Sequence, residues 1–178
     1  MKQEKKVILS FIASLWVAMP LYLILHEGGH AMIAKLFGAE IIEFNIMQAY
    51  VVVEGGILTH WSLALFYLAG LMLPTIIWML CAIFYRQHVN SMFYKSFMAL
   101  FTGFVMFSIG VWIVVPIMYS MGQAKPYDDV VQFIKASGVP AMIVALLSGI
   151  IFGLGIVLVR RKRIFRNFMD AVKRSEQE

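Results

Sequence analysis

The stretch LILHEGGHAMIAKLFG, residues 23–38, places His26, Glu27 and His30 inside an otherwise apolar run. On a helix, residues four apart lie one turn apart on the same face, so both imidazoles can reach a single Zn²⁺ at about 2.0–2.1 Å. Zinc lowers the pKa of a bound water from 15.7 to about 7. Glu27 can take the proton of that water as it attacks a carbonyl. The H-E-x-x-H pattern therefore predicts amide hydrolysis, with His26 and His30 as metal ligands and Glu27 as the base.

The composition is that of a membrane protein. Hydrophobic residues make up 61% of the 178 residues and charged residues only 14%, and the mean hydropathy is +0.82, outside the range of water-soluble domains. The single cysteine, Cys81, excludes a disulfide framework within the chain and a cysteine metal cluster. The net charge of +5 does not indicate a nucleic-acid partner, because seven of the fifteen Lys and Arg residues lie at or after Arg160, directly behind an apolar run. Membrane topology explains that cluster.

Four apolar stretches are long enough to cross a bilayer, which takes about 20 residues. They cover approximately residues 7–37, 61–85, 92–121 and 139–159. We expect a single integral-membrane metallopeptidase domain over residues 1–178, in which 160–178 form a basic cytoplasmic tail. The expected fold is an all-α polytopic membrane protein with about four transmembrane helices and a small β-hairpin or re-entrant strand element after the first.

Two segments differ from simple spans. Residues 39–58 mix β-branched and aromatic residues with glutamates and end in a glycine pair, which predicts one or two short strands and a turn. Because backbone that is not helical at membrane depth must be covered by protein or water, these strands are expected to line a wet pocket. In the segment GQAKPYDDVVQFIKASGVP, Asp128 and Asp129 open a short helix that stops near Gly138.

The distribution of Lys and Arg predicts the orientation. These residues gather before the first span, between the second and third, and after the fourth. Short cytoplasmic loops collect such residues, so both termini are expected to be cytoplasmic, in a multi-pass protein of the cell membrane. The end of the first span and residues 122–138 then lie together on the opposite side.

A catalytic zinc site usually has three protein ligands, so a third residue must join the two histidines. The orientation favours the loop around residues 122–138, where Asp128 and Asp129 compete for this role, and Glu54 in the strand region is a further candidate. A packing or pore role for the histidines is the alternative. It explains less, because it must account for two histidines and a glutamate in one span, where an Asp or Lys costs about 2.5–3.5 kcal/mol.

The chain resembles a known family in residues 20–58. The sequence HEGGHAMIAKLFGAEIIEF, followed by a strand-like segment, is similar to the core of the site-2 protease family of intramembrane zinc metallopeptidases. The resemblance implies that His26 and His30 bind zinc and that Glu27 is catalytic. The family's usual L-D-G element is absent, but DDVVQFIKASGVP is similar to an N-D…T-G-x-P segment of small members, which implies Asp129 as the third ligand.

The basic tail has two interpretations. Ile164, Phe165, Phe168, Met169 and Val172 would share one face of a helix, the pattern of a helix lying on an anionic membrane surface. A topology anchor followed by a frayed end fits the same residues.

The function expected from these residues is that of a zinc-dependent endopeptidase that hydrolyses membrane-associated polypeptides within the lipid bilayer. An edge strand within residues 43–53 would hold an unwound substrate by strand addition. Three alternatives stay open: an inactive relative that acts as a membrane scaffold, a membrane metal-ion binding or transport protein, and another zinc enzyme with a glutamate ligand on a later helix. The last is disfavoured because the later spans contain no glutamate.

Overall fold

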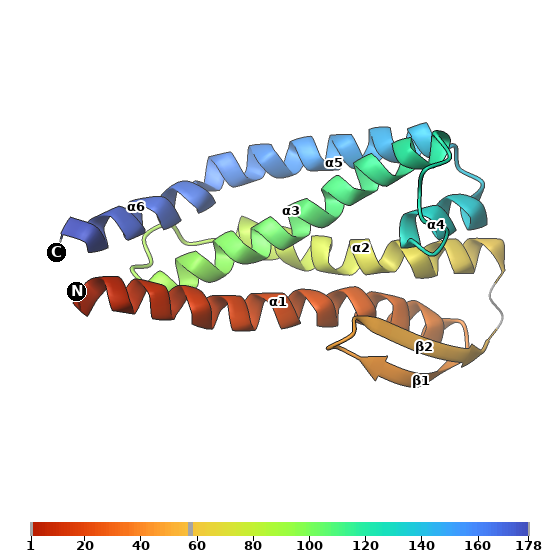
Figure 1. Ribbon diagram of the computed structural model, residues 1–178, viewed down its shortest axis with the longest axis horizontal. Coiled ribbons are helices and arrows are strands. Elements are labelled where there is room, and N and C mark those ends of the chain that lie inside the picture. The colour runs from red at the N-terminus through yellow and green to blue at the C-terminus, as the bar shows by residue number, and fades with distance from the viewer. Residues whose placement is uncertain (1, 57–58, 178) are drawn as a thin grey trace.

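A computed structural model describes residues 2–56 and 59–177 (Figure 1). The chain is mostly helical, and it contains four helices that are long and apolar enough to cross a membrane. They are α1 (Lys2–Leu36), α2 (His60–Ile83), α3 (Met92–Ser120) and α5 (Ala141–Lys162). These bounds agree closely with the four stretches predicted from hydropathy, so that expectation is confirmed.

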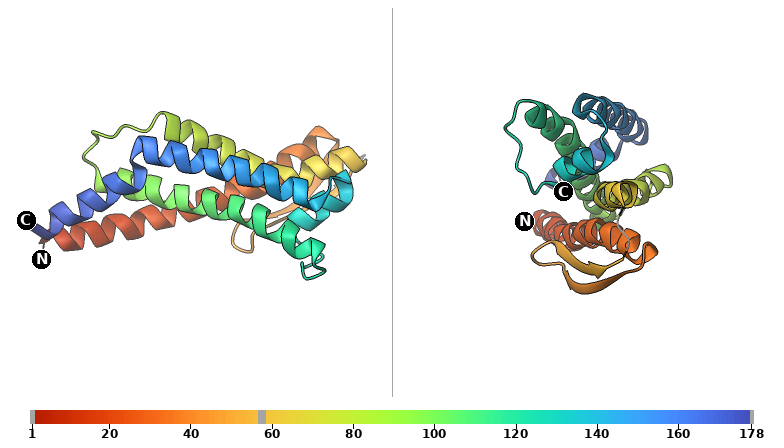
Figure 2. Two further views of the ribbon diagram at one scale, coloured as in Figure 1. Left: turned by 90° about the horizontal axis from the view of Figure 1, so that it is seen from above. Right: turned by 90° about the vertical axis from the view of Figure 1, so that its right-hand side faces the viewer.

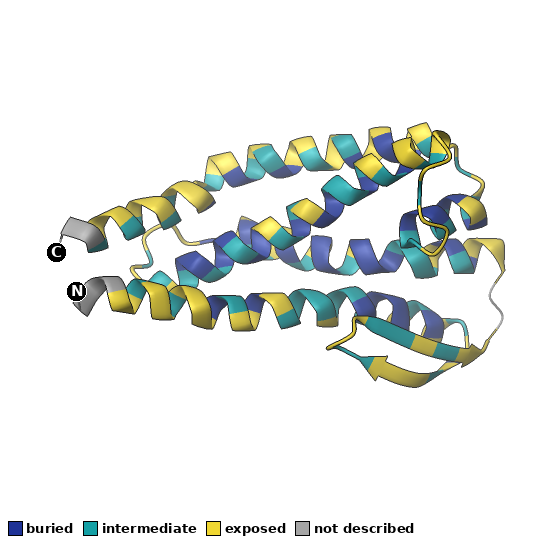
Figure 3. Ribbon diagram, viewed as in Figure 1, coloured by how far each residue is buried: buried dark blue, intermediate teal, exposed yellow. Residues whose placement is uncertain are grey.

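The long helices lie lengthwise against one another (Figures 1 and 2), with α1 packed on α2 and α3, and α3 packed on α5. Their shared core is apolar: Trp78, Phe101 and Ile109 are almost completely buried. The indole N–H of Trp78 donates a hydrogen bond to the Thr102 hydroxyl at 2.9 Å, which satisfies the one polar atom that the ring brings into the core. Much of the outward surface of these helices is exposed (Figure 3) and carries large apolar side chains, as a lipid-facing surface would.

The segment after α1 forms a two-stranded antiparallel sheet of β1 (Ala39–Asn45) and β2 (Tyr50–Gly55). Ala39 pairs with Gly55 and Asn45 with Tyr50, and a register shift between Ile41 and Glu43 bends β1. The Tyr50 hydroxyl donates a hydrogen bond to the Glu43 carboxylate at 2.5 Å. The small β element expected after the first helix is therefore confirmed, and it lies beside the second half of α1 (Figure 1).

A short helix, α4 (Asp129–Ser137), follows α3 and packs against α2. The Asp128 side chain caps its start by accepting the Val130 backbone N–H at 2.9 Å. Gly138 ends it in the left-handed conformation, with φ of 69°. Buried Val131 and Ile134 attach the helix to the bundle. The cap at the start and the glycine at the end thus fix where α4 begins and how it presents Asp129.

The tail is helical, as the first of its two interpretations predicts, and it also packs against the bundle. Helix α5 continues through Lys162, Arg163 turns the chain with φ of 54°, and α6 (Ile164–Gln177) follows. Instead of only lying on a membrane surface or fraying, α6 packs on α1 and α3, because its apolar face finds protein partners there. Ile164 is fully buried, and the Phe168 ring lies 6.1 Å from that of Phe11.

The two ends of the bundle are distinct. The N-terminus, α6 and the C-terminus lie at one end, and the β-hairpin, α4 and the start of α2 lie at the other (Figures 1 and 2). The last third of α1, which carries the histidine motif, runs into that second end.

Candidate metal centre

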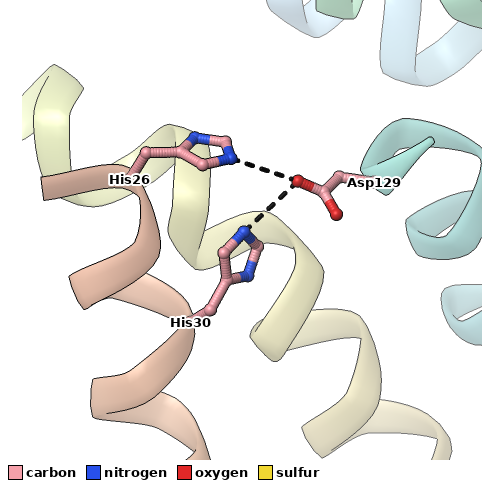
Figure 4. A group of neighbouring side chains, drawn as sticks. All are labelled: His26, His30 and Asp129. Atoms are coloured by element: carbon pink, nitrogen blue, oxygen red, sulfur yellow. Dashed lines mark ion pairs between the residues drawn. The ribbon is translucent and has the colours of Figure 1, made fainter. Parts of the chain in front are cut away.

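The two histidines of the H-E-x-x-H motif lie one turn apart on α1 and point toward α4 (Figure 4). Their ring centroids are 5.0 Å apart, and the ring planes are nearly perpendicular. His30 is almost completely buried, with 5% of its side chain exposed, whereas 21% of the His26 side chain is exposed. The helix periodicity thus gives both imidazoles a common target.

That target is the carboxylate of Asp129, the first residue of α4. Its Oδ2 atom lies 3.3 Å from His26 Nε2 and 3.2 Å from His30 Nε2. The donor atoms of the three residues all lie within 4.8 Å of one another. Within residues 2–56 and 59–177 this is the only group of three or more His, Cys, Asp or Glu side chains close enough to share a metal ion.

The protonation of His30 follows from its other nitrogen. Nδ1 lies 2.7 Å from the Phe66 carbonyl oxygen on α2, and because a carbonyl only accepts, Nδ1 must carry the proton. In the neutral ring, Nε2 therefore presents a lone pair to Asp129. This is the arrangement in which an outer partner orients a histidine for a metal.

The donor set fits a divalent cation. A lone pair on His30 Nε2 and a carboxylate oxygen repel each other at 3.2 Å unless a positive charge lies between them. Hydrogen bonds satisfy both contacts only with a proton on each Nε2 atom, which requires a charged His30, whereas a single metal ion satisfies two neutral imidazoles and the carboxylate at once. Ligand atoms around a tetrahedral zinc at 2.0–2.1 Å lie about 3.3–3.4 Å from one another, close to the two observed separations.

Asp129 is held in its charged form. Burial raises the pKa of this carboxyl, but the two imidazoles lower the pKa by more when they face it as N–H donors, so it then lies well below its usual range. Its side chain keeps 32% of its surface exposed, which leaves the centre open to water from the side of α4. A metal at this position would meet an ionised carboxylate at any physiological pH.

Glu27 lies at the edge of the centre. Its Oε1 atom is 4.0 Å from His26 Nε2, and 6% of its side chain is exposed. It does not belong to the group of three mutually close donors. A carboxylate that lies next to the ligands without being one of them is suited to accept a proton from water held at the centre, rather than to bind the ion.

Two glycines allow the helices around the centre to meet. A Cβ atom on Gly29 would lie 2.2 Å from the Ala69 carbonyl oxygen, so α1 and α2 touch backbone to backbone there. A Cβ atom on Gly70 would lie 2.4 Å from His30 Nε2 and 2.9 Å from His26 Cε1. Gly70 therefore provides the space that both imidazoles occupy.

The structure brings together His26, His30 and Asp129, with Glu27 beside them. It places the other candidates elsewhere: Asp128 caps α4, and Glu54 is exposed on β2. Sequence reasoning missed the Phe66 carbonyl, since a backbone acceptor leaves no mark on residue type. It also missed the role of Gly70, for which the Ala69-Gly70 pair in an apolar span was the available signal.

No protein-family model, characterised protein sequence or solved structure matches this chain.

Proposed function

We propose that this protein is a zinc-dependent intramembrane endopeptidase that cleaves membrane-associated polypeptides. The observation that carries the proposal is the convergence of His26 Nε2, His30 Nε2 and Asp129 Oδ2 on one point, with Glu27 adjacent. The resemblance of residues 20–58 to the site-2 protease family supports the same reading.

In this proposal His26, His30 and Asp129 hold the zinc ion, which acidifies water and polarises a carbonyl group when bound. Glu27 accepts the proton released by the attacking water and returns it to the leaving amine. The Phe66 carbonyl keeps the His30 ring in the tautomer that zinc binding needs.

The membrane setting supports the same function. Four apolar helices of 22 or more residues suggest a protein that spans the bilayer. Most Lys and Arg residues belong to the segments at the end with the two termini, and only Lys35, Lys125 and Lys135 belong to the other. We infer that the termini are cytoplasmic and that the centre lies toward the opposite side.

The β-hairpin supplies a place for substrate. A helical substrate hides its amide bonds in its own hydrogen bonds, so it must unwind before hydrolysis. The hairpin lies beside the part of α1 that carries the histidines (Figure 1), and a two-stranded sheet leaves one edge of each strand unpaired. An unwound substrate added along such an edge would present its backbone close to the centre.

Metal analysis and cleavage by matched variants test the proposal. Wild-type protein should bind one zinc per chain and His26→Ala should lose it. Glu27→Gln should keep zinc but lose cleavage of a model transmembrane segment by roughly 10²- to 10⁴-fold. Absence of zinc from the wild type would favour a scaffold, and zinc flux into liposomes without cleavage would favour transport. Normal turnover by Glu27→Gln would overturn the proposed base.

Cysteine labelling tests the orientation separately. In a Cys81→Ser background, a cysteine at position 88, between α2 and α3, should react from the cytoplasm. A cysteine at position 125, before α4, should react from the opposite side. Labelling of both positions from one side would contradict the arrangement of four spans.

A further inference from the structure

The end of the bundle remote from the metal centre contains a cavity of about 550 Å³. Three elements far apart in the sequence form its walls: the start of α1, the start of α3 and the second half of α6. Each contributes one cation, namely Lys6, Lys95 and Arg174. No Asp or Glu is among the described residues that line the cavity, so the described lining carries three positive charges and no negative one.

Lys95 is the most informative of the three cations. It lies in the first turn of α3 and is only 8% exposed. Lysine is almost never this deeply buried unless it is paired. Yet among the described residues no carboxylate lies within ion-pair distance of Lys95, and the charged pairs outside the metal centre reduce to Arg166 with Asp170. A buried cation without a protein partner, on the wall of a cavity, indicates a ligand that supplies the negative charge.

The packing around the cavity holds its walls in place. The Ser14 hydroxyl donates to the Phe93 carbonyl oxygen at 2.9 Å and fixes α1 against α3. The Phe11 and Phe168 rings, 6.1 Å apart, fix α6 against α1. The fold thus places the three cations around one space, in which Lys6 and Arg174 are exposed.

The remaining lining is of two kinds. Ser10, Asn90 and Ser175 are polar, and Val7, Leu9, Met92 and Ala171 are apolar. Lysine and arginine together favour a phosphate group, which accepts several charge-assisted hydrogen bonds. Neighbouring apolar side chains suit a phosphate that carries a hydrocarbon portion, and basic cavities between helices on the cytoplasmic side of a membrane bind lipid headgroups.

We propose that this basic cavity binds a phosphate group through Lys6, Lys95 and Arg174. The phosphate belongs either to an anionic membrane lipid or to a soluble phosphate compound. The site is independent of the proposed peptidase activity, because it lies at the other end of the bundle and uses none of the residues of the metal centre.

Calorimetric titration of the purified full chain in neutral detergent tests the proposal. The probes are a short-chain phosphatidylglycerol, the matching phosphatidylcholine and inorganic phosphate. We expect saturable binding of phosphatidylglycerol that is weaker for phosphatidylcholine, whose choline group faces the cations. Competition by inorganic phosphate at similar concentration would assign the site to soluble phosphates, and its failure to compete would assign it to the lipid. Absence of saturable binding for all three probes would overturn the proposal.

Variants locate the binding. Lys95→Met keeps most of the length of the side chain and removes its charge, so it should weaken binding roughly 10- to 100-fold, as expected for one charge-assisted hydrogen bond. Lys173→Met on α6 makes the same change outside the cavity and should leave binding within about twofold. If Lys95→Met does not fold, Lys6→Gln and Arg174→Gln, both at exposed positions, serve instead. Equal binding by the cavity variants and Lys173→Met would overturn the site.

Discussion

The two ends of the helix bundle differ in the charged groups that they bury and in how these groups are paired. At the end with the β-hairpin, one aspartate and two histidines face one another at 3.2–3.3 Å, and glycines bring the backbones close enough to hold them there. At the end with the termini, Lys95 is buried without a described anionic partner, and the cavity beside it is open. Under the two proposals made above, the first end binds a cation and the second binds an anion.

The largest effect should come from Asp129. Asp129→Asn removes the negative charge between the two Nε2 atoms. It should lower zinc affinity by more than the roughly 10- to 100-fold typical of an outer partner and abolish cleavage. Asp128→Asn is the matched control, because Asp128 caps α4; it should cost about 1 kcal/mol or less of the free energy of unfolding. Competition with a zinc chelator measures the zinc affinity of both variants, and thermal unfolding measures their stability. The reverse ranking of the two zinc affinities would move the ligand by one residue.

Gly70→Ala should weaken zinc binding at the end with the β-hairpin without unfolding the protein. The added methyl group would overlap His30 Nε2 and His26 Cε1, and side-chain rotation can relieve this clash only by moving the donors apart. We expect zinc binding to fall sharply while phosphatidylglycerol binding at the other end is kept. Gly103→Ala on α3, where no atom lies within 4 Å of the added Cβ, is the control. Full zinc occupancy in Gly70→Ala would show that the space is not needed.

Gly29→Ala and Gly28→Ala separate backbone contact from helix propensity. At position 29 the new Cβ would lie 2.2 Å from the Ala69 carbonyl oxygen, and backbone cannot rotate away, so we expect a loss of about 1–3 kcal/mol or more in the free energy of unfolding. At position 28 the nearest atom is 4.0 Å away, so the better helix propensity of alanine should leave stability equal or higher. Thermal unfolding in detergent compares the two, and equal midpoints would contradict the close approach.

The smallest effect concerns the end with the termini. The Lys162 ammonium group donates a hydrogen bond to the carbonyl oxygen of Ile83, the last residue of α2. A cation at a helix C-terminus contributes about 0.3–1 kcal/mol, so Lys162→Met should lower the free energy of unfolding by that amount and leave zinc binding unchanged. Lys173→Met, a change on the exposed surface of α6, should have no measurable effect. A change in zinc content in either variant would contradict the separation of the two ends.

How far the sequence predicts this structure depends on the range of the interactions. The four long helices and the hairpin follow from local hydropathy and residue type, and the cap by Asp128 follows from the ordinary preferences of helix starts. The His26–His30 pair follows from helix periodicity. The contact of Asp129 with that pair spans about a hundred residues, and only topology and a resemblance pointed to it.

Other features left no signal that sequence reasoning could read. The hydrogen bond from His30 to the Phe66 carbonyl depends on a backbone atom that every residue type carries. The packing of α6 on α1 and α3 depends on which apolar surfaces the bundle leaves uncovered, so an amphipathic pattern alone could not predict it. The burial of Lys95 depends in the same way on three elements meeting in space.

In the proposed membrane setting, the continuity of α1 sets the depth of the candidate metal centre. The helix rises about 1.5 Å per residue, so the interval of about 20 residues from Lys6 to His26 covers about 30 Å, nearly the full hydrocarbon thickness. If Lys6 binds a phosphate at the surface of one leaflet, as proposed, His26 lies inside the hydrocarbon region, close to its opposite edge. Water and protons would then reach the centre from the nearer aqueous phase over a short distance. In a thicker membrane the centre would lie deeper below that surface, and their access would be slower.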